Sequence, residues 1–159
     1  MTQQLTEQQK ELIEKIGVFH EQNGMQPLMG RILGLLLVLD DAEATFDEII
    51  DYLKVSKSAV STALNFMQIK KQVAYRTKPG ERKRYFYLTI KHWERDVEKE
   101  LLHIVEIKNL FKDVIAVRGD KKPEVNQSIH ELCLFLEYLN TRIPVLFENF
   151  KKMLNKPQG

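Results

Sequence analysis

The sequence has little cysteine and lacks the long apolar runs that cross membranes. Cys133 is the single cysteine among 159 residues, which excludes an internal disulfide and a metal site built from cysteines. We expect it to be a small buried hydrophobe, with a redox-sensing thiol as the alternative. The longest apolar run extends from Leu35 to Leu39, whereas a membrane-spanning helix needs about 20 residues. The N-terminus has no basic segment followed by an apolar one, so we expect no secretory signal, no membrane partner and a cytoplasmic location.

The motifs of common enzyme chemistry are also missing. The sequence contains no glycine-rich phosphate-binding loop and no nucleophile-elbow motif. Glu100 and His103 have the Glu-x-x-His spacing of di-iron helical bundles, but such a site needs a second copy of the motif and two further glutamates. The hypothesis of a helical metalloenzyme therefore depends on these two residues alone. We predict a chain that is not an enzyme and that needs no metal or cofactor.

Charge is distributed unevenly along the chain. The 43% of hydrophobic residues can bury one sizeable core, or a small domain with a helical extension. The formal net charge is only +2, but the segment from Lys54 to Arg84 holds nine basic residues and one acidic residue, a net charge of +8. The remaining 15 basic and 21 acidic residues carry −6. Segregation of this kind indicates a surface for a polyanion.

The N-terminal third is predicted to form two closely packed helices. Thr6 and Gln9 make a capping box, and apolar residues follow at helical spacing, so the first helix runs from about Thr6 to Asn23. Pro27 suits the first turn of a second helix that is apolar on most sides. Gly30 and Gly34 lie four residues apart in it, which indicates close approach of a neighbouring element.

A helix, a short turn and a second helix are predicted next. A short strand at Thr45-Phe46 precedes a helix that begins near Asp47, and Ser56 is a favoured N-cap for a second helix, over about 56–68. Val60, Ala63, Leu64 and Met67 have the spacing of its inner face. Its outer face has no carboxylate, so we predict a helix that enters the major groove of DNA, with an ordinary solvated face as the alternative. The predicted contact residues are Ser56, Lys57, Ser58, Ser61, Thr62 and Asn65.

A basic β-hairpin is predicted after this helix. Residues 72–77 and 82–88 read as strands on either side of Pro79 and Gly80, which specify a type II-like turn. Its tip would act as a wing that neutralises phosphates or enters the minor groove. The alternative is an edge strand whose charges serve solubility. The predicted contact residues of the wing and its flanks are Lys54, Arg76, Lys78, Arg82, Lys83 and Arg84.

Long helices are predicted for the C-terminal part. An apolar stripe predicts one rod over about 28 residues, from Lys91 to Arg118, and a last helical region follows that Pro144 should kink or interrupt. We predict that these helices form a dimerisation arm. The alternative is a helical hairpin that packs only within one chain. The predicted fold is mainly α with a small β-hairpin wing, comprising a winged helix-turn-helix domain (1–90) and a helical dimerisation region (91–159). The residues assigned to the stripe are Trp93, Val97, Leu101, Ile104, Phe111 and Ile115.

Three segments together resemble the MarR-type winged-helix transcriptional regulators, and within them the GbsR-like subgroup. They span 24–34, 56–64 and 79–86, and the resemblance extends over roughly 6–88. It implies a homodimer whose helix at 56–68 enters the major groove while the wing around 79–84 reaches the flanking groove. Members of this subgroup resemble repressors of osmoprotectant synthesis and uptake, and some of these repressors sense choline-like ligands.

A ligand for this chain does not follow from the resemblance. A quaternary ammonium site needs an aromatic cage, to which Phe19, His20, Phe46 and Trp93 could contribute, but the alternative role of these residues is core packing. The leading hypothesis is a sequence-specific, dimeric regulator that binds palindromic double-stranded DNA and is controlled by a small effector. The alternative is a winged-helix module that docks acidic partners or the transcription machinery without specific DNA recognition.

Overall fold

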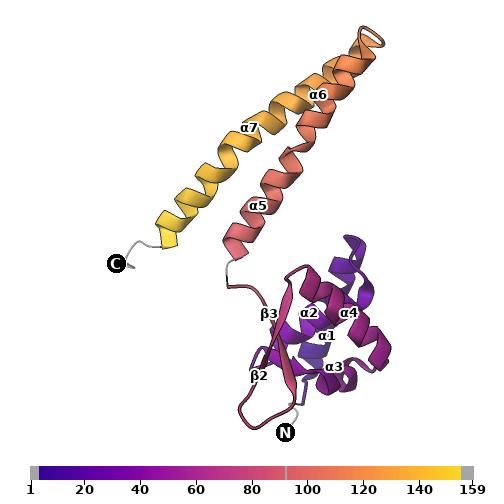
Figure 1. Cartoon of the computed structure of the whole chain (residues 1–159), viewed down its shortest axis with the longest axis vertical. Helices are drawn as coiled ribbons and strands as arrows, with labels where there is room; N and C mark the ends of the chain where they lie inside the picture. Colours follow the sequence, from indigo (N-terminus) through magenta and orange to yellow (C-terminus); the bar gives the residue numbers. More distant parts are fainter. Residues whose placement is uncertain (1–3, 92, 155–159) are drawn as a thin grey trace. The chain divides into compact units, whose positions relative to one another are not determined.

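The chain folds into two compact units that divide after Lys91 (Figure 1). The structure is a computed structural model, and it describes residues 4–91 and 93–154. The N-terminal unit contains helices and a small antiparallel sheet, and the C-terminal unit contains helices. The fold is thus mainly α with a small β component, as the sequence predicted.

Helices α1 (Glu7–Gln22) and α2 (Pro27–Val38) open the N-terminal unit. The predicted capping box is confirmed: Thr6 Oγ1 accepts a hydrogen bond from the Gln9 amide at 3.2 Å, and the Gln9 side chain accepts one from the Thr6 amide at 2.9 Å. Pro27 is the first residue of α2, where its missing N–H costs nothing.

Glycines let α1 and α2 approach closely, as predicted. A Cβ added at Gly34 would lie 3.1 Å from the Cα of Ile13, and one at Gly30 would lie 3.1 Å from the Cα of Gly17. Such distances are tighter than most Cβ contacts, so a larger residue at either position would require the backbone of α1 to move by a few tenths of an ångström. Ile32 of α2, at the centre of this packing, has no exposed surface.

Two further helices complete the helical part of this unit. Strand β1 (Glu43–Thr45) leads into α3 (Phe46–Leu53), and α4 (Lys57–Ile69) follows after a short turn. The strand begins two residues earlier than predicted and α3 one residue earlier. The reason is a second capping box, in which Thr45 caps α3 and the Glu48 carboxylate accepts a hydrogen bond from the Thr45 amide at 2.8 Å.

The sheet has three antiparallel strands in the order β1-β3-β2. Strands β2 (Val73–Thr77) and β3 (Arg84–Leu88) form the predicted hairpin, and β1 pairs with β3. The Glu81 amide donates to the Lys78 carbonyl at 3.1 Å, and Gly80 has a φ of 80°, as a type II turn requires. Val73 and Phe86 anchor the hairpin in the core.

The described part of the C-terminal unit, residues 93–154, contains three helices: α5 (Trp93–Val105), α6 (Ile107–Arg118) and α7 (Pro123–Leu154). The predicted single rod is wrong, because the helix is interrupted at Glu106. There the Glu106 amide donates to the His103 carbonyl and the Asn109 amide donates to the Glu106 carbonyl, so residues three apart are bonded in place of residues four apart. The sequence also predicted a kink or an interruption at Pro144, and the interruption is wrong, since α7 continues through this residue. Burial of Ile143 and Phe147 on either side stabilises the helix there.

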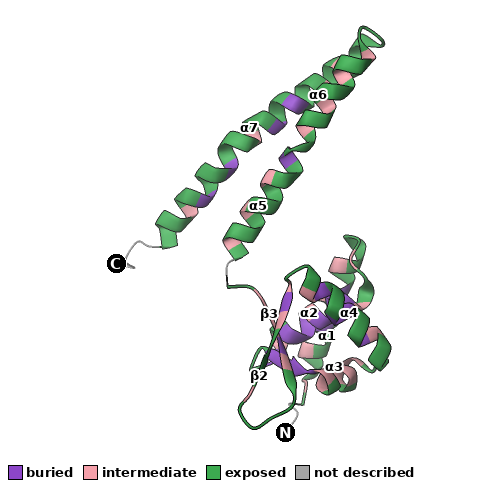
Figure 2. Cartoon of the chain, in the orientation of Figure 1, coloured by how far each residue is buried: buried purple, intermediate pink, exposed green. Residues whose placement is uncertain are grey.

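The predicted apolar stripe only partly faces α7. Val105, Leu102 and Phe111 pack with residues of α7, and the Trp93 ring contacts that of Phe150 in the same helix. Val97, Leu101 and Ile104 are instead between 36% and 56% exposed. Exposed residues make up much of α5 and α6 (Figure 2). Helix α5 carries apolar side chains on two adjacent faces. Hydrophobic spacing alone does not tell which of the two meets the neighbouring helix.

Replacing Gly34 by alanine tests the close packing of α1 against α2. Alanine is the better helix former by about 1 kcal/mol, but its Cβ would collide with the backbone of Ile13, so we expect a net loss of about 1–3 kcal/mol in unfolding free energy. Urea unfolding followed by circular dichroism measures this loss. Gln8→Ala is the control, because Gln8 is an exposed residue of α1 and alanine there adds no atoms to the contact between the helices. A Gly34→Ala variant as stable as wild type would contradict the interpretation.

Candidate nucleic-acid interface

Helix α4 presents a polar face of the predicted kind. Ser56 caps the helix, with its Oγ accepting from the Ala59 amide at 3.2 Å. Val60, Ala63, Leu64 and Met67 are at most 2% exposed, which confirms the predicted inner face. The opposite face is fixed by this burial, because the helix cannot rotate without exposing its apolar side.

The outer face of α4 is exposed and its polar groups are largely free. Lys57, Ser58, Ser61, Thr62 and Asn65 are all exposed. Ser58 Oγ lies 3.2 Å from the Ser56 hydroxyl, whereas the side chains of Ser61, Thr62 and Asn65 make no hydrogen bond or ion pair with the described part of the chain. Hydroxyl and amide groups in this state are available to base edges or phosphates.

Lys54 lies in the turn that sets the angle between α3 and α4. Its φ of 54° and ψ of 45° are left-handed, and its amide donates to the Ile50 carbonyl at 2.8 Å. A non-glycine residue in this conformation is uncommon, so the turn is tightly specified by the helices on either side. The Lys54 side chain is exposed beside the start of α4.

The wing carries two groups of cations, and the first is at its tip. Arg82 and Lys83 lie between β2 and β3, are exposed, and have no ion pair among the described residues. Arg84 is the first residue of β3, and its guanidinium lies 4.6 Å from the centre of the Tyr75 ring. Stacking of this kind orients the guanidinium plane and leaves its N–H donors available.

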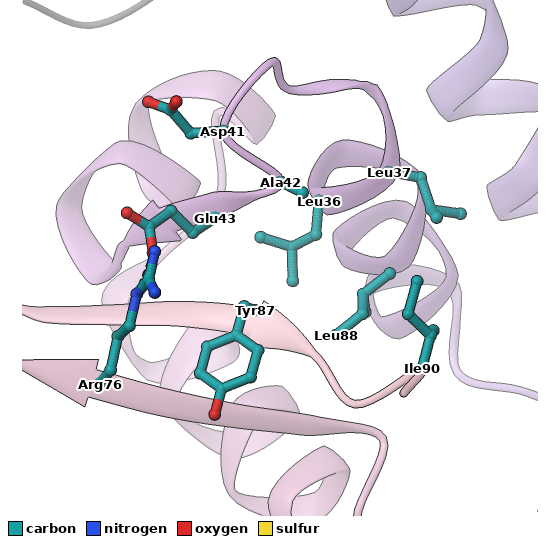
Figure 3. Close-up of a pocket in the computed structure, with 9 residues that line it drawn as sticks. All are labelled: Leu36, Leu37, Asp41, Ala42, Glu43, Arg76, Tyr87, Leu88 and Ile90. Atoms are coloured by element: carbon teal, nitrogen blue, oxygen red, sulfur yellow. Dashed lines mark hydrogen bonds and ion pairs between the residues drawn. The ribbon is translucent and has the colours of Figure 1, made fainter. Parts of the chain in front are cut away.

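The second group is bound to a buried carboxylate that the sequence analysis missed. Arg76 Nε and Lys78 Nζ each lie 2.7 Å from a different carboxylate oxygen of Glu43, whose side chain is only 5% exposed. Figure 3 shows the Arg76 guanidinium beside the Glu43 carboxylate. Burial raises the pKa of the Glu43 carboxyl, but hydrogen bonds from Arg76 and Lys78 lower it by more, so this pKa lies below its ordinary value. Glu43 is the one buried charged residue in the described part of the chain.

A pocket of about 410 Å³ adjoins this cluster (Figure 3). Its apolar wall comes from Leu36 and Leu37 of α2, from Leu88, and from Ile90 after the hairpin. Asp41, Glu43 and Arg76 supply its polar side. No local motif marks this pocket, because its lining residues are brought together only by folding.

The structure places the four ring residues suggested for a ligand cage in different surroundings. Phe19 and His20 contact each other edge to face, with ring centres 5.4 Å apart, while Phe46 packs, partly buried, against the core of the N-terminal unit. Trp93 belongs to the C-terminal unit, where its ring lies 5.7 Å from that of Phe150. None of the four lines the pocket.

The residues weighed for redox or metal chemistry have ordinary contacts. Cys133 is buried as predicted, with its Sγ 3.7 Å from the Lys108 carbonyl oxygen. His103 Nδ1 lies 3.1 Å from a carboxylate oxygen of Glu106. Residues 4–91 and 93–154 contain no group of three or more histidine, cysteine, aspartate or glutamate residues placed to hold a metal ion. None of the described helices is both long and apolar enough to span a membrane.

Comparison with known proteins places these features in context. No family model matches the chain. It is similar to the HTH-type transcriptional regulator MmpR5 of Mycobacterium tuberculosis (strain ATCC 25618 / H37Rv), with 24% identity over 129 residues that cover 81% of this chain and 78% of that protein.

Two solved structures are also similar. One, described as a transcriptional regulator, covers 91% of this chain and 99% of its own, with 21% identity and a TM-score of 0.70. The transcriptional regulator Tm0710 from Thermotoga maritima covers 89% of this chain and 91% of its own, with 19% identity and a TM-score of 0.42. The first likeness shows the fold, which is the winged-helix fold of a transcriptional regulator. The similar proteins are named as transcriptional regulators, in agreement with the prediction of a non-enzymatic chain.

The Glu43 cluster predicts a pH-dependent contribution to stability. Because the pKa of Glu43 is lowered in the folded chain, its ion pairs stabilise the fold above the unfolded pKa of about 4.3, and this stabilisation is lost as the pH falls through the folded value. We expect Glu43→Gln to lower the unfolding free energy by about 1 kcal/mol at pH 7. The difference from wild type should shrink towards zero below about pH 4.

Urea unfolding across this pH range measures the effect. Glu11→Gln is the control, because Glu11 is exposed and makes no ion pair with another described residue. A Glu43→Gln variant whose destabilisation did not change with pH would show that its carboxylate is not the source of the stability.

Proposed function

We propose that the chain is a sequence-specific DNA-binding transcriptional regulator of the MarR type, close to the GbsR-like subgroup, that represses transcription as a homodimer on palindromic operators. The observation that carries this proposal is the exposed, acid-free face of α4, which lies in the same unit as a wing with cations at its tip. The similarity to a protein named as an HTH-type transcriptional regulator supports it. A cytoplasmic location follows from this function.

The two parts of the interface have different roles in this proposal. Ser58, Ser61, Thr62 and Asn65 read base edges from α4, because short polar side chains can reach them in the major groove. Lys57 and the cations at the tip of the wing supply affinity for phosphates, which depends on salt and little on sequence. The N-terminal unit is accordingly the DNA-binding domain, residues 1–90, and residues 91–159 are the dimerisation region.

A second copy of the chain is the proposed cover for the apolar surface of the C-terminal unit. Many large apolar side chains there are exposed, more than monomeric proteins commonly leave in water. A two-fold dimer would bury part of this surface and set two recognition helices about 34–36 Å apart, one turn of DNA. The most exposed apolar side chains of α6 and α7, each above 60%, are Leu110, Val117, Leu146, Met153 and Leu154.

Control by a small effector belongs to the same proposal. An effector changes DNA affinity only if it binds one arrangement of the dimer better than another. The pocket beside Glu43 and Arg76 has the volume of a small-molecule site and combines apolar walls with a few polar groups. Phe19 and His20, whose ring centres lie 5.4 Å apart, are retained as alternative ligand contacts.

Single substitutions separate base reading from phosphate binding. We expect Asn65→Ala to lose about 1–3 kcal/mol of discrimination between the preferred DNA and unrelated DNA, because an amide can pair with an adenine edge. Arg84→Ala should weaken binding to all sequences alike. Fragments selected from a genomic DNA pool supply the preferred sequence, and fluorescence anisotropy measures both affinities. Equal effects of the two substitutions would contradict this division of roles.

The same selection tests the alternative function. A protein-interaction module would enrich no sequence from the pool and would bind DNA weakly or indiscriminately. That outcome would favour docking of the basic surface on an acidic partner or on the transcription machinery.

Charges on the exposed stripe of α5 test the dimer. We expect Leu101→Glu combined with Ile104→Glu to convert a dimer of about twice 18.7 kDa into a monomer, because buried carboxylates without partners are costly. Sedimentation velocity measures the mass, and Asn140→Glu at an exposed site of α7 is the control. A wild-type chain that sedimented as a monomer at micromolar concentration would contradict the proposed dimer.

A further inference from the structure

We propose that Glu43 is a positioning residue that holds Arg76 and Lys78 on the sheet and withholds them from DNA, so that the wing binds phosphates through Arg82, Lys83 and Arg84. This inference rests on the proposed DNA-binding function. It divides cations that look equivalent in the sequence into a structural pair and a group that contacts DNA.

The first support is the geometry of the carboxylate. Each of its two oxygens has its own cation, Arg76 Nε on Oε2 and Lys78 Nζ on Oε1, both at 2.7 Å. The Glu43 side chain is 5% exposed, so water cannot replace these partners freely. If both cations moved to phosphates, a buried carboxylate would lose its compensation, which is costly.

The second support is the topology of the sheet. Glu43 lies on β1 and Arg76 on β2, which are separated by β3. In the register, Glu43 and Ala74 both lie opposite Tyr87, and Arg76 lies opposite Tyr85. Side chains two residues apart share a face, so the ion pair passes over β3 on that face and joins the two outer strands. Ladder hydrogen bonds join each of these strands only to β3.

The third support is a series of contacts that continues from Glu43 towards the tip. Lys78 Nζ also lies 3.9 Å from the centre of the Tyr85 ring. The Tyr85 hydroxyl in turn donates to the Glu81 carboxylate in the turn. Glu43 thereby supports both strands at the base of the wing, and the position of the tip depends on it.

The cations at the tip are not bound to a carboxylate in this way. Arg82 and Lys83 have no ion pair with any described residue, and Arg84 stacks on a neutral ring. Arg76, Lys78 and Glu43 together carry a net charge of +1, whereas Glu81, Arg82, Lys83 and Arg84 together carry +2. Phosphates should therefore attract the tip more strongly than the base of the wing.

Salt dependence distinguishes the two groups without knowledge of an operator. The probe is a mixed-sequence 30-base-pair DNA duplex, and anisotropy gives its affinity for the full chain between 50 and 200 mM salt. Each cation that contacts a phosphate contributes about 0.9 to the slope of log affinity against log salt. We expect Arg82→Gln and Lys83→Gln each to flatten this slope by about 0.9 per bound subunit, and Arg76→Gln and Lys78→Gln to leave it nearly unchanged.

Removal of the carboxylate provides the converse test. We expect Glu43→Gln to steepen the slope by up to about 1.8 per bound subunit, because two cations become free to bind phosphates. Combining it with Arg76→Gln and Lys78→Gln should restore the wild-type slope. Glu11→Gln is the control: it also removes one carboxylate from the N-terminal unit, but an exposed one in α1 that forms no ion pair with a described residue.

Each outcome of these measurements decides the proposal. Loss of slope in Arg76→Gln or Lys78→Gln as large as in Arg82→Gln would overturn it, as would a Glu43→Gln slope no steeper than that of Glu11→Gln. A simple loss of fold would lower affinity without steepening the slope, and circular dichroism identifies it. A wild-type chain that bound no duplex DNA would instead contradict the proposed function.

Discussion

Burial of helix α2 is the constraint on which the N-terminal unit depends. Ile32, Leu35 and Leu36 have no exposed surface, and α1, α3, α4 and β3 all pack around this helix. Glycines on one side admit α1 at backbone distance, and large apolar residues on the others meet α3, α4 and the sheet. The orientation of α4 follows, since Val60 and Met67 must join this core. The polar face of α4 is therefore presented outward by apolar burial on its other side.

Charge on this unit acts at two levels. The excess of basic residues between Lys54 and Arg84 attracts a polyanion at long range. The ion pairs of Glu43 concern which of these charges are available at contact distance. A count of lysines and arginines treats them alike, whereas one buried carboxylate on a neighbouring strand separates them.

The sequence predicted local structure well where short-range chemistry decides it. The capping box at Thr6, the N-cap Ser56 and the turn at Gly80 each depend on residues within four positions, and each is confirmed. The continuity of the C-terminal helices was predicted less well. The helix is interrupted at Glu106, where no helix-breaking residue stands, whereas α7 continues through Pro144. Packing between the helices outweighs helix propensity at these positions.

By itself, the sequence determined the order of helices and hairpin, the polar face of α4 and the basic character of the wing, because hydrophobic period, caps and turn residues are local properties. Tertiary structure alone decided that Glu43 meets Arg76 and Lys78, 33 and 35 positions further along the chain, and that Leu36 and Ile90 line one pocket. It also decided which face of α5 meets α7. These contacts join residues far apart in the chain, and their partners are selected by the shape of the whole core, which no local pattern encodes.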